Sequence, residues 1–264
     1  MGDVRNRLEE LTTKAMNQPT EEEAASASAQ ASGMNDLLVR FVSGVAMLAV
    51  ALIALWLGGW FWIGFVVLLA SLILWEWNLL VTKFGISALA EVAWQFIGAL
   101  YVGAAALAIV QVRISYDVAG VLLAFLAPVI AVDIGAYFAG RTIGGPKILP
   151  SVSPKKTWAG LIGGAIAAGL VCIGAEAMDA GPGGFVPGLS TSAIPSAMLT
   201  GALIAVIAQA GDFFESWMKR RAGVKDSSNL LPGHGGIFDR CDGFVAVFAV
   251  LFVIAVVPAF VGFG

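Results

Sequence analysis

Long apolar segments recur along this chain and limit the folds that it can adopt. The final run, residues 243–264, contains no charged side chain, and several other runs approach its length. About 20 apolar residues are enough for a helix to cross the hydrocarbon core of a bilayer. The composition agrees, because 59% of the residues are hydrophobic and only 12% are charged, well away from the balance of a soluble domain. The sequence therefore predicts a membrane protein with several spans.

The predicted fold is an all-α transmembrane bundle, because a helix satisfies its own backbone groups in lipid. About seven spans are expected, at residues 37–57, 59–81, 89–111, 117–140, 157–178, 193–215 and 243–264. The block 37–81 is interrupted only by Gly58-Gly59, and its tryptophans cluster near the predicted span boundaries, as interfacial aromatics do: Trp56, Trp60, Trp62, Trp75 and Trp77. That block is either two full spans or a more broken arrangement, so the bundle could hold eight or nine helices.

The first 36 residues differ from the rest. Residues 17–32 are rich in Glu, Ala and Ser, a composition typical of disorder. We expect residues 1–36 to form a disordered cytoplasmic tail before a transmembrane domain at 37–264, and we see no cleavable signal peptide. The two cysteines, Cys172 and Cys241, form no framework for disulfides or zinc.

The basic residues predict the orientation. With the N-terminus in the cytoplasm, all but one of the 15 Lys and Arg residues fall on the cytoplasmic side, and Arg113 is the exception. Basic residues gather in cytoplasmic loops of membrane proteins. Two such loops, 141–156 and 216–242, carry most of this charge. Each follows a span that contains an acid, Asp133 or Asp212.

The first polar stretch, residues 133–160, contains the parts of an anion site. Asp133 lies about two turns inside its span, where a carboxylate is costly and indicates function. Arg141 follows, and then Ser153-Pro154-Lys155-Lys156-Thr157 opens the next helix with hydroxyl, N–H and ammonium groups. The same residues could simply anchor a span end, with Thr157 as a helix cap. From charge alone we favour that simpler interpretation for this stretch.

The second polar stretch, residues 211–243, favours a site over an ordinary loop. Acids and bases alternate densely there between two spans. Asp239 and Asp242 are three residues apart, so they share a face if the last helix has begun. Acids without cysteine or histidine partners suit a hard cation such as Mg²⁺. His234, the only histidine in the chain, is weak evidence by itself for a ligand or a base.

Acids for Mg²⁺ and many basic residues at one membrane face indicate phosphate chemistry. Phosphoryl and nucleotidyl transfer depend mainly on positioning and charge neutralisation. No Walker A pattern occurs, which excludes an ordinary P-loop nucleotide hydrolase.

The second stretch also resembles a family signature. It reads Ser216-x-Met218-Lys219-Arg220-x4-Lys225-Asp226-x-Ser228-x2-Leu231-Pro232-x-His234-Gly235-Gly236-Ile237-x-Asp239-Arg240-x-Asp242. This pattern closely resembles that of phosphatidate cytidylyltransferases, also called CDP-diacylglycerol synthases. Two upstream pieces are similar to the same family: Asp133-x2-Ala136-Tyr137-x2-Gly140-Arg141 and Ser153-Pro154-Lys155-Lys156-Thr157-Trp158-x-Gly160. The likeness is strongest after residue 130. Cys241 stands where the family usually has an aliphatic residue, and the first 36 residues have no counterpart.

The resemblance implies transfer of CMP from CTP to phosphatidic acid, giving CDP-diacylglycerol and pyrophosphate, at the cytoplasmic face of a bacterial inner membrane. Residues 37–264 would then be the catalytic domain. The implied catalytic residues are Asp212, Asp239, Lys225, Asp226 and His234. The implied substrate-binding residues are Ser153, Lys155, Lys156, Thr157, Lys219, Arg220, Arg240 and Arg141. The implied ligands of Mg²⁺ are Asp212, Asp239, Asp242 and Asp133, with room for a second, monovalent cation.

Other interpretations stay open. A CTP-dependent transferase for a polyprenyl or ether lipid would share the head-group chemistry. An ion-coupled transporter could use Asp133 and Asp212 as ion sites, but such proteins have inverted repeats and midplane sites, and no repeat is visible here. The expected partners are CTP, phosphatidic acid and membrane lipids, with no nucleic acid, and the chain could act as a homodimer.

Overall fold

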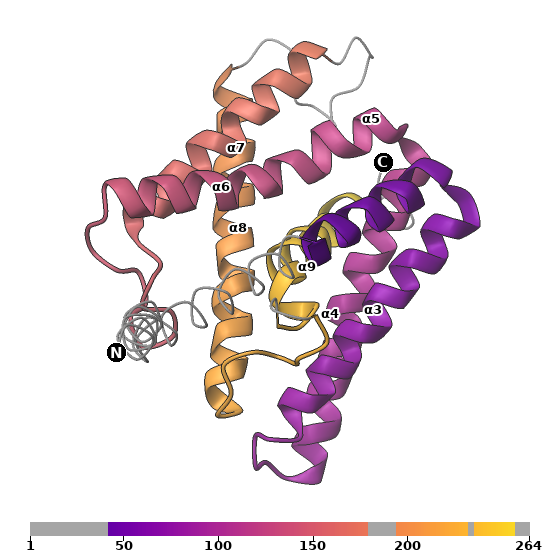
Figure 1. Cartoon of the computed structure of the whole chain (residues 1–264), viewed down its shortest axis with the longest axis vertical. Helices are drawn as coiled ribbons and strands as arrows, with labels where there is room; N and C mark the ends of the chain where they lie inside the picture. Colours follow the sequence, from indigo (N-terminus) through magenta and orange to yellow (C-terminus); the bar gives the residue numbers. More distant parts are fainter. Residues whose placement is uncertain (1–41, 179–193, 232–234, 257–264) are drawn as a thin grey trace, which may run out of the picture. The chain divides into compact units, whose positions relative to one another are not determined.

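The computed structural model describes residues 42–178, 194–231 and 235–256. Throughout these ranges the chain is helical with short connections, and no strand element occurs among them (Figure 1). The all-α prediction is therefore confirmed. The chain divides into two units, Met1–Met47 and Leu48–Gly264, and all contacts given below lie within the second unit.

A helix at Val42–Leu57 precedes the labelled elements. These are α3 (Gly59–Val81), α4 (Ala88–Ser115), α5 (Val118–Gly120), the π-helical turn η1 (Val121–Leu126), α6 (Ala127–Thr142), α7 (Trp158–Met178), α8 (Ile194–Arg221), α9 (Phe238–Leu251) and the π-helical turn η2 (Phe252–Val256). The segments α5, η1 and α6 together form one apolar helix, Val118–Thr142.

Five helices in the described part of the chain are long and apolar enough to cross a membrane: α3, α4, the Val118–Thr142 helix, α7 and α8. The first and last predicted spans include residues outside the described ranges, so the count of seven stays a prediction. The predicted tail, 1–36, and the 179–192 loop also lie outside those ranges.

The break between the first helix and α3 falls at Gly58, as the sequence indicated. Gly58 and Gly59 have φ angles of 62° and 48°, in the left-handed region that favours glycine. Arg113 closes this turn, since its Nε donates to the Leu55 carbonyl at 3.0 Å and its Nη1 to the Tyr116 carbonyl at 3.3 Å. A Cβ on Gly58 would lie 2.8 Å from Nη2 of Arg113. Arg113, the one basic residue that falls outside the predicted cytoplasmic side, thus has a structural role.

Two helix boundaries differ from the prediction. Residues 216–221 were expected in a loop but continue α8, which ends at Arg221. The basic residues Lys219, Arg220 and Arg221 occupy its last turn, where cations are favourable next to the carbonyl end of a helix. Gly223, with φ 69°, terminates it in the usual left-handed conformation. The last helix begins at Phe238 rather than Gly243, so Asp239 and Asp242 do lie on a helix.

One hydrophobic core joins α3, α4, α8 and α9 around Trp77. This side chain is fully buried, and its Nε1 donates to the Trp94 carbonyl at 3.0 Å. Its ring contacts Phe214 of α8 and Phe238 of α9, with centroids 5.7 and 5.9 Å away. A Cβ on Gly98 would lie 2.5 Å from the indole. Aromatic packing therefore sets how α8 and α9 sit on the α3–α4 pair.

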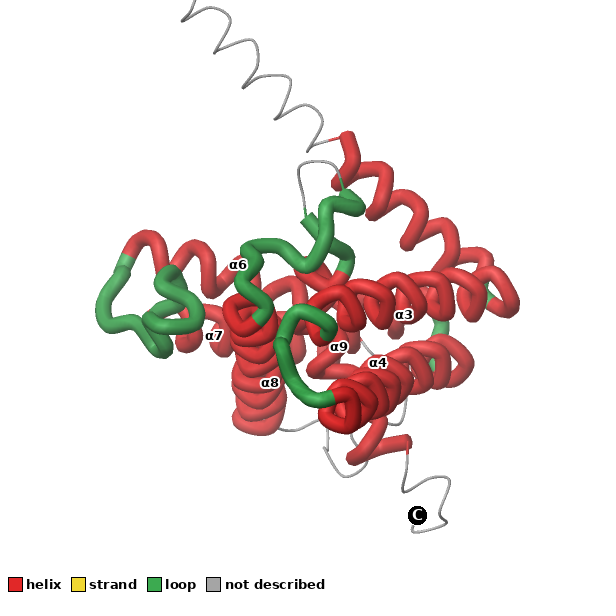
Figure 2. Tube along the Cα trace, turned by 90° about the horizontal axis from the view of Figure 1, so that it is seen from below, coloured by secondary structure: helices red, strands yellow, loops and turns green. Residues whose placement is uncertain are grey.

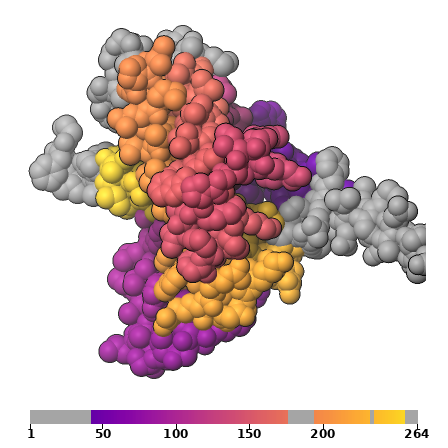
Figure 3. Space-filling model, turned by 90° about the vertical axis from the view of Figure 1, so that its left-hand side faces the viewer, coloured from indigo at the N-terminus to yellow at the C-terminus, as the bar shows by residue number. Residues whose placement is uncertain are grey.

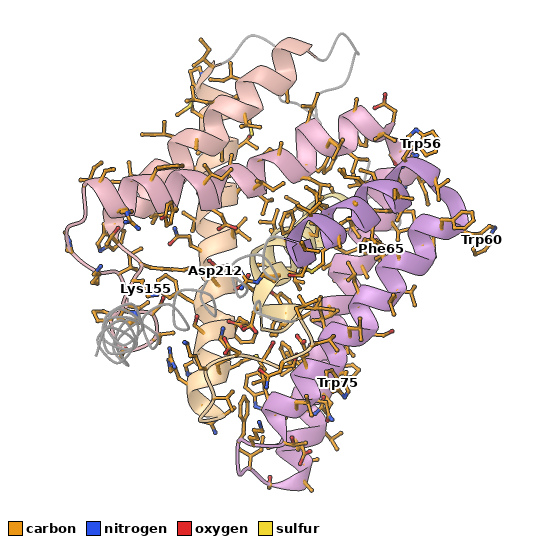
Figure 4. All side chains as sticks on the ribbon, in the orientation of Figure 1. Trp56, Trp60, Phe65, Trp75, Lys155 and Asp212 are labelled. Carbon is orange, nitrogen blue, oxygen red and sulfur yellow. The ribbon has the colours of Figure 1, made fainter. Side chains whose placement is uncertain are left out.

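The other tryptophans of the first apolar block divide into two groups. Trp56 and Trp60 are 73% and 85% exposed, and both project outward near the turn at Gly58 (Figure 4). Such positions suit the interfacial role expected from the sequence. Trp62, like Trp77, is instead buried, because both belong to the core-facing side of α3.

A second core joins α6, α7 and α8 through small residues. A Cβ on Gly135 of α6 would lie 2.5 Å from the Gly163 carbonyl of α7. Likewise, a Cβ on Gly201 of α8 would overlap the backbone of Gly169 in α7. Small residues let membrane helices approach closely where the hydrophobic effect gives little drive.

Helix α8 belongs to both cores. It packs against α7 on one side and α9 on the other, and α9 also packs against α4 (Figure 2). Polar groups on α8 can consequently meet groups from either half of the bundle.

The predicted orientation can be tested at the two ends of the Val118–Thr142 helix. In a chain with Cys172 and Cys241 replaced by Ala, Ser115→Cys and Ser151→Cys should label with a membrane-impermeant maleimide from opposite sides. Ser115→Cys should react in intact cells and Ser151→Cys only in inverted vesicles. Labelling of both from the same side would contradict the topology.

Candidate active site

The C-terminal turn of α8 meets the first turn of α9 through an ammonium group. The Nζ of Lys219 lies 2.6 Å from Glu215 Oε2 and 2.6 Å from Asp239 Oδ1. Glu215 is buried and its Oε1 has no hydrogen-bond partner in the described structure. Two acids thus share one cation at this junction.

The second oxygen of Asp239 binds the connection between α8 and α9. Its Oδ2 accepts the Ser227 N–H at 2.9 Å, the Gly236 N–H at 2.8 Å and contacts the Ser227 hydroxyl at 3.0 Å. Burial alone would raise the pKa of Asp239, but hydrogen bonds from Glu215, Lys219, Gly236 and Ser227 outweigh it and hold the pKa well below its usual range. Asp239 is therefore a fully bonded carboxylate that folds the loop onto α9.

A third acid, Glu76 of α3, joins this network and was missed from the sequence. Its side chain is fully buried. Oε1 accepts from the Ser228 hydroxyl at 2.6 Å and the Ile237 N–H at 2.9 Å. Oε2 accepts from the Phe238 N–H at 2.6 Å and contacts the Ser227 hydroxyl at 3.0 Å. The available signal was that Glu76 is the only charged residue between Arg40 and Lys83.

A separate ion pair joins the 143–157 loop to the middle of α8. Lys156 Nζ contacts Asp212 Oδ2 and lies 5.1 Å from the centroid of Phe213. The space-filling view shows this loop lying beside the C-terminal part of α8 (Figure 3). Lys155, the preceding residue, is exposed and lies on the loop beside α8, while Asp212 projects from α8 itself (Figure 4).

The backbone of the 143–157 loop explains why Lys156 reaches α8. Lys147 and Thr157 form an antiparallel bridge, and the Ile148 N–H donates to the Lys156 carbonyl at 3.1 Å. Thr157 is buried, and its Oγ1 accepts the Gly160 N–H at 3.0 Å. The threonine thus caps α7, one of the two roles that the sequence allowed.

Two further acids interact with Asp212 through their charges. The charges of Asp133 in α6 and Asp242 in α9 both interact with Asp212, and Lys156 interacts with both. Close packing of α8 and α9 brings them together, since a Cβ on Gly211 would lie 2.7 Å from the Asp242 carbonyl. A Cβ on Gly243 would lie 3.3 Å from Asp212 Oδ1. Lys156 is therefore paired with Asp212, and the charges of two more carboxylates, Asp133 and Asp242, act on the same pair.

The oxygen donors around Asp212 are candidates to bind a divalent cation. Among residues 42–178, 194–231 and 235–256, no three His, Cys, Asp or Glu side chains converge as a ready metal site. Magnesium, however, is usually held by one or two carboxylates together with water and substrate phosphates. Asp212 and Asp242 supply hard oxygen donors of that kind. Asp239 is already occupied by Lys219, Ser227 and Gly236.

The other candidate residues lie around these pairs. Arg141 donates to the Tyr137 hydroxyl at 3.1 Å and is exposed. The side chains of Arg220, Lys225, Asp226 and Arg240 are exposed and Ser153 is half-buried. His234 lies outside the described residues. The network of Glu76, Glu215 and Asp239 is therefore mostly buried, Asp212 and Lys156 are part-buried, and Asp133 is exposed like the charged groups of the rim.

Comparisons with known proteins identify the family. Residues 79–257 match the model of the cytidylyltransferase family, and this range contains every group above except Glu76.

Three curated relatives carry the name phosphatidate cytidylyltransferase. The protein of Brucella suis is 42% identical over 168 residues, which is 63% of this chain and 58% of the relative. That of Rickettsia bellii is 38% identical over 133 residues, 50% of this chain and 56% of the relative. That of Pseudomonas aeruginosa is 39% identical over 135 residues, 50% of this chain and 47% of the relative. The matches span about half the length of these relatives. Because the family match covers most of the sequence, the chain belongs to the cytidylyltransferase family.

Proposed function

We propose that the chain transfers CMP from CTP to phosphatidic acid, giving CDP-diacylglycerol for phospholipid synthesis and releasing pyrophosphate. The observation that carries the proposal is the ion pair of Lys156 with Asp212, on which the charges of Asp133 and Asp242 also act. Acids and a base held close together suit two polyanionic substrates. The names of the relatives and the family match support the choice of CTP and phosphatidic acid.

In the proposed reaction, a phosphate oxygen of phosphatidic acid forms a bond to the α-phosphorus of CTP. The bond from that phosphorus to the oxygen shared with the β-phosphate breaks, and pyrophosphate leaves with the electron pair. A phosphomonoester has a second pKa of about 6, so the attacking oxygen is largely ionised at neutral pH. No general base is required, and the main barrier is repulsion between anions.

The chain's own residues would lower that repulsion. Lys155 and Lys156 on the 143–157 loop and Lys219 on α8 would pair with phosphate oxygens. The exposed rim of Arg141, Arg220, Lys225 and Arg240, together with Ser153, Thr157, Asp226 and His234, is proposed to complete the substrate sites. Asp239 would hold Lys219 and the α8–α9 connection in place.

Magnesium is the proposed cofactor, held by Asp212 and Asp242 with Asp133 nearby. When bound, it would neutralise charge on the phosphates of CTP and on the leaving group. Asp239 was expected among the ligands, and it could contribute only by giving up its bond to Lys219. A second, monovalent cation stays a proposal with no residue assigned.

The proposed location is the bacterial cytoplasmic membrane, with the site facing the cytoplasm where CTP is available. The apolar helices would let the lipid tails remain in the bilayer while the head group meets the nucleotide. A homodimer is also proposed, and the mass of the purified protein in detergent would test it.

The proposed activity predicts stoichiometric products. Purified chain in mixed micelles should convert CTP and phosphatidic acid into CDP-diacylglycerol and pyrophosphate in a 1:1 ratio, and chelation of Mg²⁺ should stop the reaction. A polyprenyl phosphate and an ether lipid offered in competition distinguish the alternative acceptors. Pyrophosphate release that depends on either of those lipids, but not on phosphatidic acid, would refute the assignment.

Adjacent lysines provide a matched pair of variants. Lys156→Ala removes the partner of Asp212, so turnover should fall by about 100-fold, the scale of losing one charge-stabilising donor. Lys155→Ala removes an equal charge from an exposed position and should cost about ten-fold or less, mainly as a higher KM for CTP. Equal effects of the two substitutions would show that the ion pair with Asp212 has no special role.

Substitutions of Asp212 and Asp239 should have different effects in the same assay. Asp212→Asn should abolish most activity and weaken the dependence on Mg²⁺, since a carboxamide is a poorer ligand. Asp239→Asn should lower turnover while leaving the Mg²⁺ concentration for half-maximal rate unchanged, because Asp239 binds Lys219 rather than the metal. A large shift in that concentration for Asp239→Asn would instead place Asp239 in the metal shell.

A further inference from the structure

Glu76 is a buried charged group that the proposed reaction leaves without a role. It lies on α3, before the residues matched by the cytidylyltransferase family, and its side chain has no exposed area. A carboxylate in such surroundings is strongly destabilising unless donors surround it. Its donors all come from the α8–α9 connection and the start of α9.

The two oxygens of Glu76 are used in the same way. Each faces one serine hydroxyl and one backbone N–H: Ser228 and Ile237 at Oε1, Ser227 and Phe238 at Oε2. A backbone N–H can only donate. Both oxygens must therefore accept, which a carboxylate can do and a carboxamide cannot.

The Ser227 hydroxyl connects Glu76 to the site. It lies 3.0 Å from Glu76 Oε2 and 3.0 Å from Asp239 Oδ2, so its single proton serves one carboxylate at a time. The Ser227 N–H donates to Asp239, and Asp239 pairs with Lys219. A continuous polar chain thus runs from α3 through the loop to the last turn of α8.

The space around Glu76 admits no side chain at Gly236. A Cβ on Gly236 would lie 2.7 Å from both carboxylate oxygens of Glu76. Gly235, with φ 81°, turns the backbone immediately before it. The glycine pair therefore brings the backbone close enough for the Ile237 and Phe238 N–H groups to reach one carboxylate.

We propose that Glu76 is a positioning residue that fixes both ends of the 227–237 loop and thereby holds Asp239 and Lys219 in their working arrangement. It touches neither CTP nor lipid in this scheme. The predicted effect of Glu76 on turnover rests on the proposed function. Its predicted effect on the loop does not depend on any substrate.

The test compares Glu76→Gln with Glu91→Gln, which removes a carboxylate from the first turn of α4. In either orientation, the amide nitrogen of Glu76→Gln faces a backbone N–H. Hydrogen exchange of peptides covering 224–231 and 235–240 should therefore become at least ten-fold faster. Turnover should fall about ten-fold or more, the usual effect of losing a supporting carboxylate, while the KM for CTP changes less than about three-fold. Glu91→Gln should leave all three quantities unchanged.

Ser228→Ala supplies a second, milder variant that removes one donor to Glu76. It should lower turnover about three-fold alone and have no further effect in the Glu76→Gln background, because the two residues act through one contact. Equal losses in both backgrounds, or wild-type exchange and turnover in Glu76→Gln, would overturn the proposal. If the wild-type chain showed no CTP-dependent transfer, the proposed function would fail while the exchange experiment still decided the role of Glu76.

Discussion

Charged groups buried in an apolar bundle need partners, and this constraint organises the polar part of the molecule. An isolated carboxylate among apolar helices would be strongly destabilising. Glu76, Asp239 and Asp212 each meet donors that lie outside the helix carrying the acid. The helices cannot satisfy these acids alone, so the two polar connections must fold back against the helix ends. The loops are ordered by the acids, and the acids are stabilised by the loops.

Helix α8 determines which donors are available. Its successive turns carry Asp212, Glu215 and Lys219, and it belongs to both hydrophobic cores. Asp212 meets Lys156 from the α6–α7 half, whereas Lys219 meets Asp239 from the α3–α4–α9 half. Any tilt of α8 would therefore move both polar pairs together. Aromatic packing at Phe214 and close backbone contact at Gly201 oppose such a tilt.

Much of this arrangement could be predicted from the sequence. The length of the apolar segments identified the helices, and the acids inside two of the spans identified the region of the candidate site. The end of α8 was misplaced because charged residues were expected to lie in a loop, whereas Lys219 to Arg221 form the last turn of the helix. Glu76 was missed because it stands between Trp75 and Trp77, which were considered only as interfacial aromatics. The pairing of Asp239 with Lys219 depends on the path of the backbone through Gly235 and Gly236, which no spacing rule specifies.

Arg113 has a consequence for how the chain enters the membrane. In the predicted orientation its charge must cross the bilayer during insertion, and a charged side chain in the hydrocarbon core is costly. The carbonyl acceptors at Leu55 and Tyr116 exist only once the helix of residues 42–57 and α4 have both formed. Arg113 therefore gains both bonds only when the two helices are in place, which couples the position of α4 to that of the first helix.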